Sequence, residues 1–254
     1  MDRQQQKLLA ETAALAGELM LTSGAETFRA EDTMAHILRK GTTSRVTPLA
    51  LTTSILVTLE DEVHEPLTIV RRVSSGSTKL GRIVRINEIS RDFCDEKITL
   101  EEAYDQLLHL KRNEYNRLIY NLATIGTTVG FALFFGGSWL DTFAALLVST
   151  VLALLITFGK KNKMAGFIVN CLSCVGMSFT CALLKETIMP TMDMDIVIIS
   201  GLMPVVPGVA ITNAVRDTLQ GDYISGSARM LEAFLTAASI AIGVGIGVMI
   251  YRLI

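Results

Sequence analysis

Five stretches of 18 to 21 residues after residue 117 have no charged side chain or, in one case, a single one near the edge. These stretches are 118–135, 139–158, 164–184, 196–215 and 233–251. A helix that crosses the hydrocarbon core of a bilayer needs about 20 mostly apolar residues. The sequence therefore predicts a polytopic α-helical membrane domain over 117–254, with five transmembrane helices at these positions.

Charged residues gather in the other part of the chain. Residues 1–116 hold 15 of the 23 Lys and Arg, 18 of the 25 Asp and Glu, and all three His. This part has a formal net charge of −3 and the composition of a soluble domain, whereas residues 117–254 have +1. The overall charge of −2 gives no indication of a nucleic-acid partner.

Residues 1–116 predict a small α+β domain. Helical spacing covers about 3–21, 79–95 and 99–114, and the β-branched runs 52–60 and 67–73 predict a hairpin connected through 60–66. Ser23 and Glu26 fit a capping box that opens a helix ending near Gly41, and Thr99 and Glu102 fit a second one.

Basic residues predict the orientation in the membrane, because cytoplasmic loops are enriched in Lys and Arg. On one side of the predicted bundle, the segment before the first helix and two connections hold eight basic residues: Lys111, Arg112, Arg117, Lys160, Lys161, Lys163, Arg216 and Arg229. The opposite side holds two basic residues, Lys185 and Arg252. Glu11 and Glu18 interrupt any signal-peptide core at the N-terminus. We therefore expect a multi-pass plasma (inner) membrane protein with a cytoplasmic N-terminal domain and the C-terminus outside.

Small residues in the predicted membrane helices favour close packing. Gly126-x-x-x-Gly130 and Gly243-x-x-x-Gly247 let helices approach one another, within the chain or, as the alternative, in a dimer. Cys171, Cys174 and Cys181 share one helical face with no basic neighbour, so we interpret them as packing residues rather than a redox or metal site.

The fourth predicted membrane helix contains two prolines near the bilayer midplane. Pro204 and Pro207 lack the N–H groups that would bond to the carbonyls of Ser200 and Met203. Pro207 also suits the first position of a new helix over 208–217. A half-helix that starts at membrane depth directs its N–H groups at an anionic group such as a carboxylate. A simple proline kink with an interfacial ion pair is the alternative interpretation.

Few other polar side chains lie in these segments. The candidates for the substrate path are Pro204, Pro207, Gly208, Asn213, Arg216, Asp217, Asn170 and Asn121. The two asparagines Asn121 and Asn170 either line a path or form hydrogen bonds between helices. No acidic residue lies deep in the membrane, and Asp141 and Asp217 are edge candidates for proton coupling.

Two stretches together resemble the threonine/serine exporter family over nearly the whole chain. The first runs from Ser23 to Met34 (SGAETFRAEDTM), and the second from Gly201 to Gly226 contains PVVPG, NAVRD and GDY. The resemblance implies export of threonine and serine, or of succinate by split pairs. It also implies that this chain is the larger half of a two-component form, working with a smaller membrane subunit or as a homo-oligomer.

The N-terminal signature contains a group of charged residues. Glu26, Arg29, Glu31 and Asp32 match the family pattern and are candidates for a docking or gating contact between the cytoplasmic domain and the membrane part. A row of surface ion pairs along one helix explains Glu26, Arg29 and Asp32 equally well. His36 lies on the same helix, where a solvated face is a simpler interpretation than a metal or acid–base site.

The leading prediction is therefore a subunit of a secondary transporter that exports small carboxylate-bearing metabolites, and not an enzyme. No Walker-type phosphate loop is present, so we do not expect ATP to be the energy source of this chain. We expect no cofactor and no metal. Two alternatives remain. A membrane-anchored hydrolase is disfavoured by the lack of a Gly-x-Ser-x-Gly elbow and by five helices where an anchor needs one. A sensor without transport is disfavoured by the break in the fourth helix.

Overall fold

The computed structural model describes residues 2–41, 45–60, 65–74, 76–110 and 116–253, without the side chain of residue 252. The chain forms two compact units. Unit 1 consists of residues 1–114 and 209–231, and unit 2 of residues 115–208 and 232–254. The sequence predicts one boundary, after residue 116. In the structure, residues 209–231 also cluster with the N-terminal part.

Among the described residues, unit 1 contains four helices that precede the candidate membrane spans. They are α1 (Arg3–Thr22), α2 (Thr27–Gly41), α3 (Leu80–Cys94) and α4 (Leu100–Leu108). The helix predicted up to residue 114 thus ends at Leu108, and residues 111–115 lie outside the described part. The capping box of Thr99 and Glu102 is confirmed, because each side chain bonds to the main-chain N–H of the other residue.

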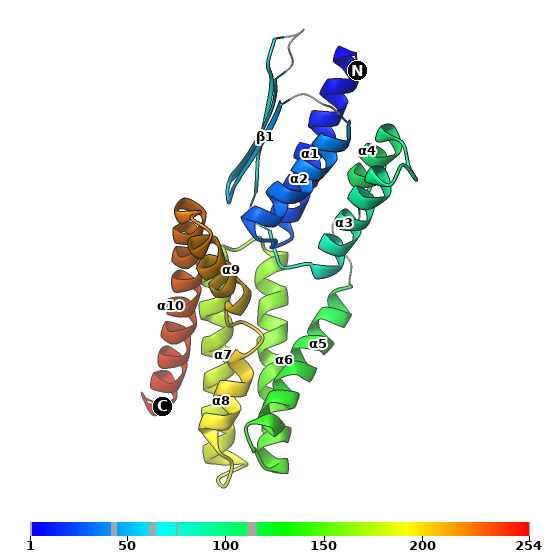
Figure 1. Cartoon of the computed structure of the whole chain (residues 1–254). Coiled ribbons are helices and arrows are strands. Elements are labelled where there is room, and N and C mark those ends of the chain that lie inside the picture. Colours follow the sequence, from blue (N-terminus) through cyan, green and yellow to red (C-terminus); the bar gives the residue numbers. More distant parts are fainter. Residues whose placement is uncertain (1, 42–44, 61–64, 75, 111–115, 254) are drawn as a thin grey trace. The chain divides into compact units, whose positions relative to one another are not determined.

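The sheet of unit 1 has the antiparallel order β1-β2-β3, with β1 (Arg45–Leu51), β2 (Ser54–Glu60) and β3 (Leu67–Arg72) (Figure 1). The predicted hairpin is confirmed as β2–β3, but residues 61–64 of its connection lie outside the described part. Strand β1 was not predicted. Its Pro48 fits the edge position that β1 occupies in the sheet, because an edge strand tolerates a residue without an N–H group.

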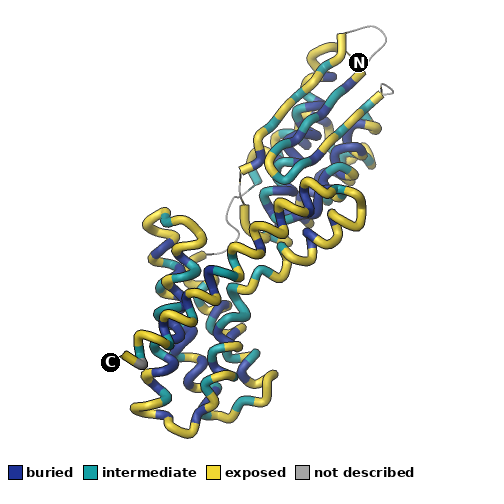
Figure 2. Tube along the Cα trace, turned by 90° about the vertical axis from the view of Figure 1, so that its left-hand side faces the viewer, coloured by how far each residue is buried: buried dark blue, intermediate teal, exposed yellow. Residues whose placement is uncertain are grey.

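The core of unit 1 lies between one face of the sheet and helices α1 to α4. Ile55, Val57 and Leu59 alternate along β2 and are buried, together with Leu9 and Met20 of α1. This alternation is the pattern of a strand with one face toward a core. Figure 2 shows the buried positions as dark blue stretches along these elements.

Unit 1 also includes the hairpin formed by α9 (Gly208–Leu219) and the start of α10 (Tyr223–Leu253). Its turn contains Gly221, whose φ of +92° lies in the left-handed region that glycine adopts at no steric cost. A Cβ on Gly226 would lie 2.2 Å from Thr218 Oγ1 and 3.0 Å from Ala214 O. Glycine at position 226 therefore permits α9 and α10 to pack closely.

Unit 2 contains α5 (Arg117–Phe134), α6 (Trp139–Lys161), α7 (Gly166–Thr187), α8 (Met194–Leu202) and the remainder of α10. Its core consists mainly of buried aliphatic, alanine and methionine side chains, including Val148, Leu152, Met177 and Val197. Buried Asp141 joins the start of α6 to that of α8, because it accepts bonds from the N–H groups of Ser138 and Asp193, both at 2.7 Å.

Four helices among the described residues are long and apolar enough to cross a membrane: α5, α6, α7 and α10. The fifth predicted span, 196–215, is not a single helix. It is divided between α8 of nine residues and α9 of twelve, with turns from Met203 to Val206. At about 1.5 Å per residue, neither piece reaches the length of a bilayer core.

Candidate functional site

The turn between α1 and α2 differs from the predicted capping box. Ser23 is the C-cap of α1 and donates its hydroxyl proton to Leu19 O at 2.6 Å. Gly24 follows with a φ of +83°, which a residue in the first turn of a helix does not adopt. Helix α2 consequently begins at Thr27, three residues later than predicted, and Glu26 precedes the helix instead of capping it.

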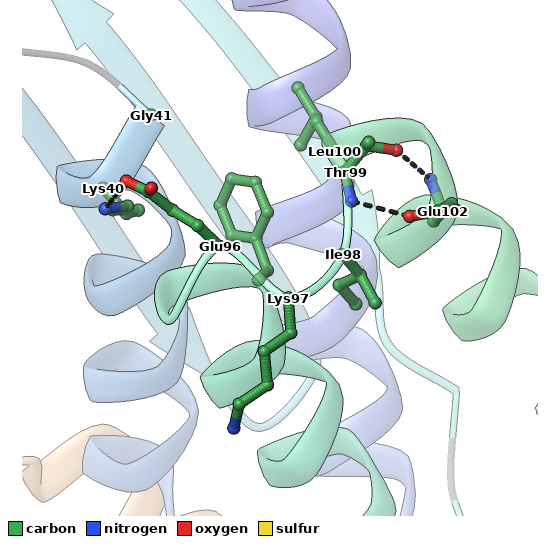
Figure 3. Close-up of a pocket in the computed structure, with 9 residues that line it drawn as sticks. Lys40, Gly41, Glu96, Lys97, Ile98, Thr99, Leu100 and Glu102 are labelled. Carbon is green, nitrogen blue, oxygen red and sulfur yellow. Dashed lines mark hydrogen bonds and ion pairs between the residues drawn. The ribbon is translucent and has the colours of Figure 1, made fainter.

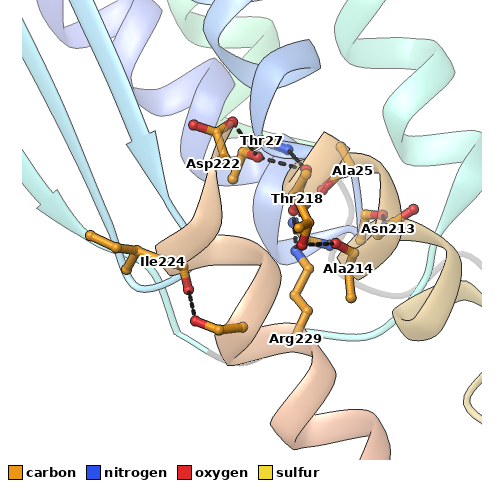
Figure 4. A network of polar contacts seen from close by, with 11 residues as sticks. Ala25, Thr27, Asn213, Ala214, Thr218, Asp222, Ile224 and Arg229 are labelled. Carbon is orange, nitrogen blue, oxygen red and sulfur yellow. Dashed lines mark hydrogen bonds and ion pairs between the residues drawn. The ribbon is translucent and has the colours of Figure 1, made fainter. Parts of the chain in front are cut away.

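Three buried side chains of the α9–α10 hairpin bind the main chain of this turn (Figure 4). Asn213 Nδ2 donates to Gly24 O at 2.9 Å, and Arg229 Nη2 donates to Ala25 O at 2.7 Å. Asp217 Oδ1 accepts from Thr27 N at 3.2 Å and from Thr27 Oγ1 at 2.7 Å. We call the turn residues Gly24–Thr27, together with Asn213, Arg216, Asp217, Asp222 and Arg229, the turn cluster.

Asp217 serves as an N-terminal cap of α2 although it comes from another helix. Thr27 N is the first N–H of α2, and such groups lack a partner within their own helix. A carboxylate at this end of a helix accepts the hydrogen bond and interacts favourably with the helix dipole. The sequence spacing assigned the N-terminal cap of this helix to Ser23. In the structure Asp217 caps the helix, 190 positions after Thr27.

An ion pair lies at the centre of the turn cluster. Arg229 Nε is 3.0 Å from Asp217 Oδ2, and the two side chains are 10% and 0% exposed. The two atoms form an ion pair, and neither has a hydrogen-bond partner among the described residues. Because charges removed from water are costly unless paired, each of these residues requires the other.

Two further acidic residues surround the same turn. Thr27 Oγ1 lies 3.2 Å from Asp222 Oδ2 as well as near Asp217, and its single proton serves one carboxylate at a time. Glu31 of α2 accepts a bond from Ala50 N at 2.8 Å. Burial raises the pKa of Glu31 above its usual value, and the charges of Asp222 and Asp217 raise it further.

Glu26 and Arg216, both predicted as site residues, form an ion pair with each other. Glu26 is buried, whereas the Arg216 side chain is largely exposed. Arg29 and Asp32 are exposed, and the described residues contain no ion pair that joins Arg29 to Glu26 or Asp32. The predicted row of surface ion pairs is therefore wrong, because Glu26 turns to α9.

The structure separates the predicted path residues into two groups. Asn213, Arg216 and Asp217 belong to the turn cluster in unit 1, whereas Asn121, Asn170, Pro204 and Pro207 lie in unit 2. Asn121 Oδ1 accepts from Thr157 Oγ1 at 2.8 Å and thereby joins α5 to α6, and Asn170 is half-buried on α7.

In the turns after α8, main-chain N–H groups donate hydrogen bonds to the carbonyls that precede Pro204. Ser200 O, which loses its partner at Pro204, accepts from Met203 N at 3.3 Å. Leu202 O accepts from Val205 N at 2.9 Å and from Val206 N at 3.1 Å. Pro207 then immediately precedes Gly208, the first residue of α9.

Sequence reasoning missed Thr27, Asp222 and Arg229 as members of a site. In the sequence, Arg229 serves only as a basic residue that indicates orientation in the membrane. In the structure Arg229 is 9% exposed, and an arginine buried to this extent needs an acidic partner. The left-handed glycines Gly24 and Gly221 mark the two turns that meet in the cluster. In the sequence, the available signal for this site was that each of the two glycines lies close to charged residues.

A pocket of about 430 Å³ lies elsewhere in unit 1, between the end of α2 and the α3–α4 connection (Figure 3). Lys40, Glu96 and Lys97 line it with Ile98, and Lys40 is already paired with Glu96 at 2.6 Å. None of the predicted site residues lines this pocket. Among the residues that the structure describes, no group of His, Cys, Asp and Glu is arranged to hold a metal ion.

Comparisons with known proteins agree on one family. A family model described as "Putative threonine/serine exporter" matches residues 11–251. The chain is 23% identical over 96% of its length to a "Probable threonine/serine exporter" of Mycobacterium tuberculosis, and 22% identical over 95% to the "Threonine/serine exporter" of Corynebacterium glutamicum. It covers 46% and 51% of these two proteins, about half the length of each. Among solved structures, none matches significantly.

Proposed function

The chain belongs to the threonine/serine exporter family, and on that premise we propose that it is a subunit of a secondary transporter that exports small carboxylate-bearing metabolites. Threonine and serine, or a dicarboxylate such as succinate, are the proposed substrates. The observation that carries the proposal is the family match over residues 11–251, which takes in the four apolar helices together with most of unit 1.

We place the substrate near the turns that follow α8. Pro204, Pro207 and Gly208 end one short helix and begin another, within the segment predicted to cross the membrane. Gly208 N already donates to Val206 O, and the N–H groups that follow it at the start of α9 suit a carboxylate, which half-helices bind in the same way in other transporters. Asn121 and Asn170 are proposed as further polar residues of the path.

A docking role is proposed for the turn cluster. Asn213, Arg216 and Asp217 bind the α1–α2 turn through its main chain and through Glu26. In this proposal, the cluster couples unit 1 to transport by holding the α9–α10 hairpin, while Arg29, Glu31 and Asp32 of α2 adjust that contact.

A second membrane chain is proposed to complete the transporter. The chain spans about half the length of the relatives it matches. That subunit is a smaller membrane protein of the same family or another copy of this chain. The distribution of basic residues supports an inner-membrane location with a cytoplasmic N-terminus and an external C-terminus.

Flux of labelled threonine and succinate into proteoliposomes tests the proposal. We would reconstitute this chain alone, the smaller membrane protein alone, and both together. Substrate-dependent flux only with both establishes a two-chain exporter and its substrate. Flux from this chain alone rules out the obligatory partner, and no flux of either compound from any combination contradicts the proposed function.

Arg216→Ala tests the docking role within the same assay. The variant removes the partner of Glu26, and we expect lower flux with near-normal expression. Arg39→Ala, an exposed arginine in the last turn of α2, is the matched control. Normal flux in Arg216→Ala removes this residue from the proposed site.

A further inference from the structure

Buried hydroxyl groups occur on every helix of unit 2. They belong to Thr124, Thr128, Ser149, Ser173, Ser178, Ser200 and Ser239, all 6% exposed or less. Six of the seven donate to a main-chain carbonyl three or four residues earlier in their own helix. This is the usual arrangement for serine and threonine inside helices.

Ser173 is the exception among these buried hydroxyls. Its side chain is 1% exposed, and its Oγ has no hydrogen-bond partner. An unpaired hydroxyl in an apolar interior costs free energy, so each such group in a native protein calls for an explanation. The neighbouring helical carbonyl of Val169 offers the bond that the other six hydroxyls make, and Ser173 does not use it.

Helical geometry directs Ser173 toward α6 and α8. Val169 and Met177 lie one turn before and after Ser173, on the same face of α7. A Cβ on Gly159 of α6 would lie 2.7 Å from the Val169 side chain, and one on Gly201 of α8 would lie 2.6 Å from Met177 Sδ. Ser173 therefore faces the region between these two helices.

The end of α8 lies at the same level. Cys181 Sγ is 4.0 Å from Met194 O at the start of α8, and Met177 is beside Gly201 near its end. The two helices consequently run antiparallel. One turn back from Met177 along α7 leads to Ser173, and the chain beyond Gly201 leads to the turns that contain Pro204 and Val205. We therefore expect Ser173 to lie near these turns.

We propose that Ser173 is a substrate-binding residue, whose hydroxyl donates a hydrogen bond to a carboxylate oxygen of the exported metabolite as it passes the end of α8. This inference rests on the proposed function and deepens it. A hydroxyl that is not committed to its own helix is free to donate to a substrate. Its bond to an anion is strong because residues 164–184 of α7 carry no charge and the surroundings are apolar.

Ser173→Ala separates a binding role from a packing role. Removal of an unsatisfied buried hydroxyl is neutral or stabilising, because no bond within the protein is lost. The variant is therefore expected to keep or raise the thermal stability of the protein while it weakens transport. Ser149→Ala is the matched control, since Ser149 is equally buried but already donates to Leu146 O at 3.1 Å.

The experiment measures KM and kcat for flux in proteoliposomes that hold the complete transporter, with whichever of threonine and succinate the wild-type protein carries. We expect Ser173→Ala to raise KM about ten- to a hundredfold, the range for loss of one hydrogen bond to a charged group, with kcat nearly unchanged. Ser173→Cys, with a weaker donor, should give an intermediate KM, and Ser149→Ala should keep the wild-type KM.

Equal KM values in Ser173→Ala and wild type overturn the inference and leave the proposed function standing. A raised KM together with a lower melting temperature in Ser173→Ala also overturns it, because that result indicates packing. A wild-type transporter that neither carries nor binds threonine or succinate refutes the proposed function itself, and the inference with it. Equilibrium binding of the same two compounds to detergent-solubilised protein distinguishes that case.

Discussion

At the scale of single residues, the turn cluster shows how a few side chains hold two distant segments of the chain. Asp217 accepts a hydrogen bond from the first N–H of α2 through Oδ1 and forms an ion pair with the guanidinium of Arg229 through Oδ2. Asn213 and Arg229 take up two main-chain carbonyls of the α1–α2 turn. Because the main chain of the turn supplies three of its contacts, at Thr27 N, Gly24 O and Ala25 O, the conformation of the turn matters as well as its side chains.

Asp217→Asn should destabilise the protein, because it leaves Arg229 buried without an anionic partner. Loss of one member of a buried ion pair costs about 3–5 kcal/mol. Combining it with Arg229→Met should recover much of that loss, since no unpaired charge remains. Unfolding free energies of the two single variants and the double variant in detergent measure the coupling; additive effects would contradict a direct pair.

Glu31→Gln should alter how stability depends on pH. The folded-state pKa of Glu31 is raised by burial and then by Asp222 and Asp217, so folding favours the protonated form. The stability contributed by the protonated carboxyl is fully present below the pKa of the unfolded chain and is lost as pH rises through the folded-state pKa. Melting temperatures from pH 4 to 8 should therefore rise in Glu31→Gln relative to wild type, chiefly toward pH 8.

Asp32→Gln provides the control for this pH series, because Asp32 lies on the same helix and is exposed. A pH profile of Glu31→Gln that is parallel to the wild-type profile would show that Glu31 does not contribute to the dependence.

At the scale of elements, α10 is held against α7 by glycines. A Cβ on Gly243 would lie 2.5 Å from Cys171 O, and one on Gly247 would lie 2.0 Å from Ser178 Oγ. The prediction of close packing at this Gly-x-x-x-Gly pair is therefore confirmed within one chain. Around Gly126 and Gly130 of α5, in contrast, a Cβ would meet no described atom within 4 Å.

Gly247→Ala and Gly245→Ala form a matched pair on α10. At Gly247 the new methyl group meets main-chain atoms of α7, with Val175 O at 2.5 Å, so we expect destabilisation of about 1–3 kcal/mol. At Gly245 nothing lies within 4 Å, and the higher helix propensity of alanine predicts no loss or a gain of up to about 1 kcal/mol. Thermal melts of both variants check the difference, and equal effects would contradict the close contact.

At the scale of the whole molecule, the chain does not divide at a single point. Residues 209–231 follow the first three membrane helices in sequence but cluster with the N-terminal unit. Helix α10 begins in that unit and continues into unit 2 without interruption. The number of crossings consequently depends on the segment that contains α8 and α9.

Topology reporters decide that number. If residues 194–219 cross the membrane once, the chain crosses five times, and the C-terminus lies on the opposite side from the N-terminus. We expect a phosphatase fused after residue 254 to be active outside the cell, and one fused in the basic connection near residue 163 to be inactive. An inactive C-terminal fusion would mean that residues 194–219 enter and leave the membrane on the same side and do not cross it.

The sequence by itself determined the features that depend on neighbouring residues. The apolar lengths of α5, α6, α7 and α10 were predictable because hydropathy is a local property, and the capping box at Thr99 because its partners are three residues apart. The family was recognisable because its two signatures lie in continuous stretches.

Tertiary structure decided the remainder, because long-range partners override local preference. Ser23 and Glu26 have the spacing of a capping box, yet Asp217 caps α2 and Arg216 pairs with Glu26. Strand β1 contains Pro48 and still forms, because it pairs with β2 along one side only and lies at the edge of the sheet. Burial of Asp217 and Arg229, and the unpaired hydroxyl of Ser173, exist only once helices far apart in the sequence have packed and excluded water.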